Sequence, residues 1–138
     1  MDQSALQAMC YRSQLHRDLS IQLTDLEAGL WLEAVVPKPW LKNQEPIHGG
    51  ILATLIDTAA TFALIRASGH DWSTVDLRVD YVRPVLSPHI WVEAVAVQVG
   101  RTLGRATCRL GSVTEPVAAL GVATFRRGAS LEELEAEG

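Results

Sequence analysis

The chain has 138 residues, a length that suits one domain with a sizeable hydrophobic core. Its net charge of −4 argues against non-specific nucleic-acid binding, which needs a basic excess. Residues 1–20 lack a secretory signal pattern, and the longest apolar region, 47–65, is interrupted by polar residues and makes a poor membrane span. Two cysteines are too few for a disulfide framework. We therefore expect a cytoplasmic protein that binds neither nucleic acid nor membrane.

The first third of the chain predicts a helix, a hairpin and a loop. Residues 2–16 place apolar side chains on one side, which is typical of a short amphipathic helix. Residues 19–36 indicate two strands separated by a turn at 27–29. The prolines in 37–47 predict a loop.

The longest predicted element is a helix over 49–68. It is apolar on nearly every side, so it should be buried, and Ser68-Gly69 supplies its end. Four strands follow, joined by short turns that make them antiparallel; they are expected near 74–83, 90–99, 103–111 and 117–127.

These elements predict an α+β fold in which a curved antiparallel sheet wraps one long central helix. The apolar face of the first of the four strands should cover that helix; it carries Val75, Leu77, Val79 and Tyr81. The expected organisation is an amino-terminal helix within 1–17, one main domain over 18–127 and an acidic tail over 128–138.

Asp57 is the most informative residue of the predicted helix. Aspartate is unfavourable inside helices, and burial of its charge is costly without partners. Together with Asp57, the hydroxyl residues Thr54, Thr58 and Thr61 form a narrow polar stripe that suits a cleft or a wet interface. Two interpretations stay open: a functional carboxylate, or a structural one bonded to those hydroxyls or to a loop backbone.

His48-Gly49-Gly50 precede or open the same helix. Glycines let a ligand approach the backbone, and the free amides of a helix start favour negative charge, including an oxyanion. The competing interpretation is a loop-to-helix junction in which the glycines serve only the turn and His48 packs or caps.

The segment HGGILATLIDTAATFAL, followed by STVDLRVDYVRP, resembles the hotdog-fold thioesterases of the phenylacetate-degradation (PaaI-like) type, and the resemblance spans residues 26–127. It implies a hotdog fold that hydrolyses an acyl- or aryl-coenzyme A without a cofactor. Asp57 would be the general base or nucleophile, the Gly49 amide would polarise the thioester carbonyl, and His48 would position the turn. Asn43 and Thr74 are the nearest matches to two further polar residues of some members, although the interval from Asn43 to His48 is one residue short.

The spacing of Gly49 and Asp57 bears on assembly. Eight residues span about 12 Å along a helix, whereas a base and an oxyanion donor must each reach within about 3 Å of one thioester. Two antiparallel copies of the helix could pair Gly49 of one subunit with Asp57 of the other, and the resemblance implies such a shared site. We expect a homodimer, with a dimer of dimers as a further assembly.

Other features are less specific. The four histidines lack metal-ligand spacing, so no metal site is expected. The tryptophans are expected in the core or at an interface rather than as substrate platforms. Five arginines are either ordinary solvated charges or ligands for the phosphates of coenzyme A: Arg101, Arg105, Arg109, Arg126 and Arg127. The alternative functions are a hotdog enoyl-CoA hydratase or dehydratase, and a non-catalytic acyl-CoA-binding domain.

Overall fold

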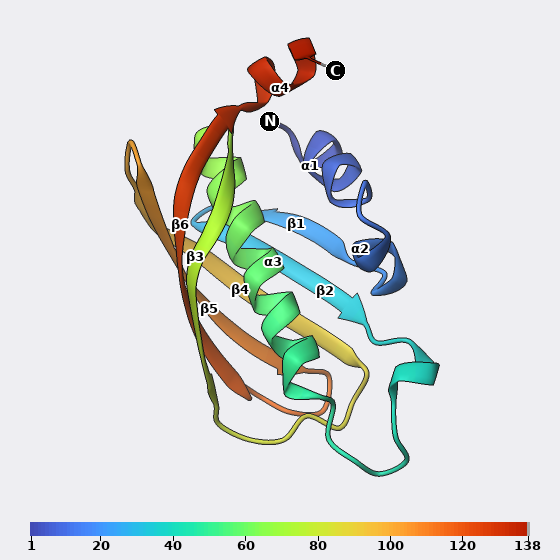
Figure 1. Cartoon of the computed structure of the whole chain (residues 1–138). Helices are drawn as coiled ribbons and strands as arrows, with labels where there is room; N and C mark the ends of the chain where they lie inside the picture. Colours follow the sequence, from blue (N-terminus) through green and yellow to red (C-terminus); the bar gives the residue numbers. More distant parts are fainter. Residues whose placement is uncertain (138) are drawn as a thin grey trace.

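A computed structural model of the chain describes residues 1–137. One six-stranded antiparallel sheet curves around helix α3 (Gly49–Ser68), as Figure 1 shows. The strands lie in the order β1-β2-β4-β5-β6-β3, which leaves β1 and β3 at the two edges. Their bounds are β1 (Gln22–Leu26), β2 (Gly29–Val35), β3 (His70–Tyr81), β4 (His89–Val99), β5 (Leu103–Ser112) and β6 (Ala119–Ser130). The predicted α+β fold around one central helix is confirmed.

Helix α3 has the predicted bounds, and both of its ends have a physical cause. At its start His48 is the N-cap, and at its end Gly69 adopts a left-handed φ of 70°, which glycine tolerates without strain. By length and by its mean hydropathy of 1.5 the helix would also suit a bilayer. It lies instead in the concave face of the sheet, with Leu55, Ile56 and Leu64 fully buried.

Strand β3 departs from the predicted alternation. Its pairing with β6 shifts register between Thr74 and Asp76, so Val75 is the extra residue of a β-bulge and is 61% exposed. Leu77 and Val79 still pack against the core as predicted. The prediction that Val75 covers the helix is wrong, because the bulge breaks the period of two that a regular strand maintains.

The amino-terminal segment forms two helices rather than the single predicted one, α1 (Gln3–Cys10) and α2 (Gln14–Asp18). The Gln7 side chain ties α1 to the sheet, donating to the Ile21 carbonyl at 2.8 Å and accepting from the Leu23 amide at 2.7 Å. The His16 ring of α2 meets Phe62 of α3 edge to face at 6.0 Å. Each helix thus has its own anchor, and the chain turns between them.

Two short elements complete the fold. A 3₁₀ turn, η1 (Lys38–Trp40), lies in the predicted loop before α3. In the carboxyl-terminal segment predicted as an acidic tail over 128–138, β6 continues to Ser130 and helix α4 (Leu131–Glu137) follows; Gly138 lies outside the described residues.

Candidate active site

The polar stripe of α3 consists of three threonine hydroxyls that bond to the helix backbone and of the Asp57 carboxylate. Thr54, Thr58 and Thr61 each donate to the carbonyl one turn earlier, at 2.9, 2.7 and 2.7 Å. Such bonds satisfy the hydroxyls locally. The structural interpretation in which these threonines bond the Asp57 carboxylate is therefore wrong.

Asp57 instead receives a hydrogen bond from the neighbouring strand. The Thr74 hydroxyl donates to Asp57 Oδ1 at 2.7 Å, across the junction between α3 and β3. Asp57 is half-buried, and no hydrogen bond among the described residues uses its second oxygen, Oδ2. The carboxylate is thus held by one oxygen, and the other can accept a proton or attack a substrate.

Cys108 lies near this carboxylate on β5. Its thiol donates to the Ile56 carbonyl at 3.6 Å. Burial, with a smaller contribution from the charge of Asp57, raises the pKa of Cys108 to about 12. At neutral pH the group is a protonated thiol and hence a poor nucleophile. The carboxylate is the better candidate for the reactive group.

The start of α3 presents a backbone amide. His48 Nδ1 accepts from the Gly50 amide at 2.9 Å, so the histidine caps the helix as one interpretation foresaw. The Gly49 amide donates no hydrogen bond among those of residues 1–137. Its position in the first turn, where amides lack helical acceptors, leaves it able to bind an oxyanion.

Tyr81 at the end of β3 is a neighbour of Gly49 that the sequence did not reveal. Its hydroxyl donates to the Gly49 carbonyl at 2.6 Å. A Cβ atom added to Gly49 would lie 3.2 Å from the Tyr81 ring and hydroxyl, tighter than ordinary contact. The tyrosine therefore fixes the first turn of α3, and it explains the small residue there.

Not every predicted site residue is brought together. Thr74 lies beside Asp57, and His48 adjoins Gly49, whereas Asn43 is an exposed loop residue whose side chain makes no hydrogen bond to the described residues.

The five arginines divide into two groups. Arg109 pairs with Glu93 at 2.9 Å, and Arg127 donates to the Gly100 carbonyl at 2.9 Å while lying 5.0 Å over the Trp72 ring. The other three are exposed and are the cations available to an anionic ligand: Arg101, Arg105 and Arg126. Within residues 1–137, no group of three His, Cys, Asp or Glu side chains is placed to hold a metal ion.

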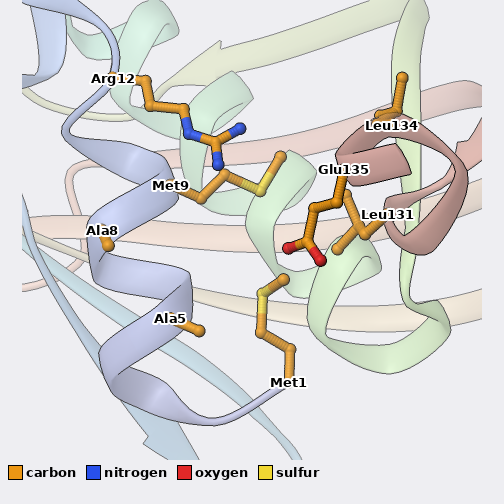
Figure 2. Close-up of a pocket in the computed structure, with 8 residues that line it drawn as sticks. All are labelled: Met1, Ala5, Ala8, Met9, Arg12, Leu131, Leu134 and Glu135. Atoms are coloured by element: carbon orange, nitrogen blue, oxygen red, sulfur yellow. The ribbon is translucent and has the colours of Figure 1, made fainter. Parts of the chain in front are cut away.

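A separate cavity of about 550 Å³ lies between α1 and α4, and Figure 2 shows its lining. Met1, Met9 and Leu131 give it an apolar wall, and Arg12 and Glu135 are its charged residues. Figure 1 shows α4 near the end of α3 opposite its first turn. None of the predicted site residues lines this cavity. It is therefore separate from the candidate site, which lies at the middle and the start of α3.

Known proteins share both the sequence and the fold of this region. Residues 46–119 match the family model described as the thioesterase superfamily. A Halobacterium salinarum protein named "putative esterase" is 44% identical over 62 residues, which are 42% of this chain and 40% of that protein. The chain thus matches less than half of that relative's length.

Two solved structures have the same architecture. The E. coli PaaI protein from the phenylacetic acid degradation operon aligns with a TM-score of 0.79 at 21% identity, covering 90% of this chain and 91% of its own. A Bacillus halodurans protein solved with CoA aligns with a TM-score of 0.76 at 23% identity, covering 92% and 86%. The fold is therefore the hotdog fold. Because the family model matches more than half of the sequence, the chain belongs to the thioesterase superfamily.

Proposed function

We propose that the chain hydrolyses an acyl- or aryl-coenzyme A to a free carboxylic acid and coenzyme A. The observation that carries this proposal is the Asp57 carboxylate, held through Oδ1 by Thr74 at 2.7 Å and half-buried in the middle of a helix that opens on the Gly49 amide. Membership of the thioesterase superfamily supports a thioester as the bond that is cleaved. The CoA-bound relative supports coenzyme A as the thiol.

Two routes are compatible with this geometry. In one, Asp57 Oδ2 takes a proton from water, and the hydroxide oxygen attacks the thioester carbonyl. In the other, Oδ2 attacks directly and water hydrolyses the resulting anhydride. In both, the Gly49 amide donates to the carbonyl oxygen that becomes negative, the C–S bond breaks, and the coenzyme A sulfur leaves with the bonding electrons as a thiolate. In the first route the thiolate takes the proton that Asp57 removed from water; in the second it takes a proton from the water that hydrolyses the anhydride, and either transfer regenerates the Asp57 carboxylate.

The site is proposed to be shared between two subunits. Asp57 lies eight residues after Gly49 on one continuous helix, about 12 Å at the standard rise, too far for both to act on one carbonyl. Strand β3 is an edge strand whose outer backbone groups are unpaired within the chain, and it adjoins both Asp57 and Gly49 through Thr74 and Tyr81. Pairing of β3 with the same strand of a second copy would bring Gly49 of one subunit to Asp57 of the other.

We propose two further properties. The sheet surface exposes Leu120 and Val122 of β6, which could join two dimers into a tetramer. Cys10 and Cys108 are free and buried, which fits a reducing compartment such as the cytoplasm.

The test of the chemistry is the replacement of Asp57 by Asn, which keeps the volume and removes the base. Release of free thiol from a panel of CoA esters should fall at least about a hundredfold. Glu27→Gln is the matched control, because Glu27 is an exposed acid in the turn between β1 and β2, away from both the candidate site and β3. Thiol release by Asp57→Asn at more than half of the unmodified rate would contradict the assignment.

A mixed dimer tests whether the site is shared. Gly49→Pro removes the amide donor, and proline suits the first helical turn because the φ of Gly49 is not positive. The Tyr81 side chain must shift by a few tenths of an ångström to admit the new Cβ, so the folding of the variant is verified by its urea midpoint. Dimers that contain one Gly49→Pro chain and one Asp57→Asn chain would combine both defects in one cleft and leave the other intact. About half of the unmodified activity should reappear from two nearly inactive parents. Mixed dimers as inactive as the parents would refute sharing.

A further inference from the structure

A second cavity, of about 230 Å³, opens beside the start of α3. Its apolar wall is formed by Leu15 and Leu19 from the α2 region, Trp40 from η1 and Ile51 from α3. His48 and Gly50 complete the lining at the helix start. The cavity therefore borders the same turn that carries the Gly49 amide.

The lining contains no Asp, Glu, Lys or Arg, and two of its polar side-chain atoms are already hydrogen-bonded. The Thr54 hydroxyl at the cavity wall already donates to the Gly50 carbonyl at 2.9 Å. His48 Nδ1 already accepts from the Gly50 amide. A ligand in this space would meet mainly hydrocarbon, together with the Trp40 indole and the His48 imidazole, so the chemistry favours an uncharged, largely apolar group.

Two large apolar side chains on the lining are incompletely covered. Leu15 is 43% exposed and Trp40 is 40% exposed, although they come from separate elements. Trp40, expected in the core or at an interface, thus lies outside the core. Apolar surface that converges on a cavity from two elements is typical of a binding site.

We propose that this cavity binds the apolar acyl or aryl group of the thioester, and that Leu15 and Trp40 set the size of the group accepted. The inference rests on the proposed function, since the thioester carbonyl at the Gly49 amide would direct its acyl substituent across Gly50 into the cavity. A space of about 150 Å³ accommodates benzene. The cavity therefore suits a phenyl ring with a short linker, or a chain of roughly eight carbons, and disfavours carboxylated acyl groups.

The residues proposed to set the size of the acyl group lie before the segment that matches the family model. Leu15, Leu19 and Trp40 all lie outside residues 46–119, the segment that matches the superfamily model. The reactive carboxylate and the amide lie inside it. On this proposal the chemistry lies in the segment that matches the family model, which also lines part of the cavity, and the two residues that set the size of the acyl group lie before that segment.

Leu15→Trp, which fills the cavity, tests this assignment against Leu103→Trp, a matched control on β5 at a leucine that is 47% exposed and outside the lining. Each methylene excluded from the cavity should lower kcat/KM roughly fourfold. If Leu15→Trp displaces two or more methylenes of the acyl group, kcat/KM for octanoyl-CoA or phenylacetyl-CoA should fall at least about 15-fold. The kcat/KM for acetyl-CoA should change less than about twofold. Leu103→Trp should leave all three values unchanged. Identical profiles for the two variants would overturn the assignment.

A binding measurement separates this inference from the proposed hydrolysis. The thioethers S-octyl-CoA and S-ethyl-CoA cannot be hydrolysed, and their affinities are measured by titration calorimetry. The unmodified chain should bind the octyl compound at least about 15-fold more tightly, and Leu15→Trp should abolish that preference. Trp40→Ala removes one wall of the cavity and should also weaken the preference for the octyl compound. This variant replaces Leu15→Trp in the test if Leu15→Trp does not fold. Equal affinity for both thioethers in the unmodified chain would refute the cavity, whereas a clear preference in a chain that hydrolyses no CoA ester would refute only the proposed function.

Discussion

Replacing Thr74 by Val tests whether the carboxylate depends on its partner on β3. Valine has nearly the shape of threonine but cannot donate, so the 2.7 Å bond to Asp57 Oδ1 is lost. A hydrogen bond to a charged group contributes about 1.5–3 kcal/mol. If that amount orients Asp57 in the transition state, turnover should fall about 10- to 150-fold. The Thr74 hydroxyl is the partner of a half-buried carboxylate, so the free energy of unfolding should also fall, by about 1 kcal/mol, and the loss of kcat is measured on the folded fraction.

The assay is steady-state hydrolysis of one CoA ester, with kcat and KM resolved. A positioning role predicts a lower kcat with little change in KM, and rescue by Thr74→Ser, which restores the hydroxyl. Ser73→Ala is the control on the same strand, because no described hydrogen bond involves its hydroxyl. A Thr74→Val variant with at least half of the normal kcat, or a Thr74→Ser variant as impaired as the valine, would refute the positioning role.

The remaining predictions concern the start of α3 and the buried thiol. Tyr81→Phe keeps the ring but removes the hydroxyl that donates to the Gly49 carbonyl. The free energy of unfolding should fall by about 1 kcal/mol, and turnover should fall by less than about tenfold. An unchanged urea midpoint would contradict a contribution of this bond to stability. For Cys108 the raised pKa of about 12, against 9.0 for an unperturbed thiol, means that the unfolded chain loses its proton first. The contribution of the Cys108 thiol to the free energy of unfolding is therefore fully present below pH 9. It decreases as the pH rises from 9 toward 12, by up to about 1.4 kcal/mol per pH unit. Urea titrations between pH 8 and 11 should show a steeper decline for the unmodified chain than for Cys108→Ala, and parallel declines would show that the thiol does not contribute.

The central helix was predictable because its signals are local. A predominantly apolar composition, a following glycine and a preceding proline-rich segment indicate a helix over residues 49–68 without tertiary information. Asp57 and the Gly49-Gly50 pair could be singled out for the same reason, since aspartate and glycine are both unfavourable in a helix, and their proposed roles stay predictions. Thr74 needed the family resemblance, because nothing in its strand marks it as the partner of a carboxylate 17 residues earlier.

The features that were missed depend on contacts between elements. Val75 fits the period of two, and only the pairing of β3 with β6 produces the bulge that exposes it. Tyr81 fits the same period, yet its hydroxyl reaches the Gly49 carbonyl because β3 ends beside the start of α3. The cavity beside Trp40 likewise requires α2 and η1 to meet the helix, and neither local propensity nor spacing specifies that meeting.

Gly69 is the whole connection between the helix that carries Asp57 and the strand that carries Thr74. A one-residue junction has almost no freedom to relax, and it is tied further by the Leu131 amide, which donates to the Gly69 carbonyl at 2.9 Å. The chain itself therefore holds Asp57 and Thr74 close to each other, while the cavity wall from α2 and η1 attaches to α3 from another part of the chain. Under the proposed function, substitutions at Leu15 and Trp40 change which acyl group is accepted at constant chemistry, so a combinatorial library at these two exposed positions would explore substrate range and leave the Asp57–Thr74 pair in place.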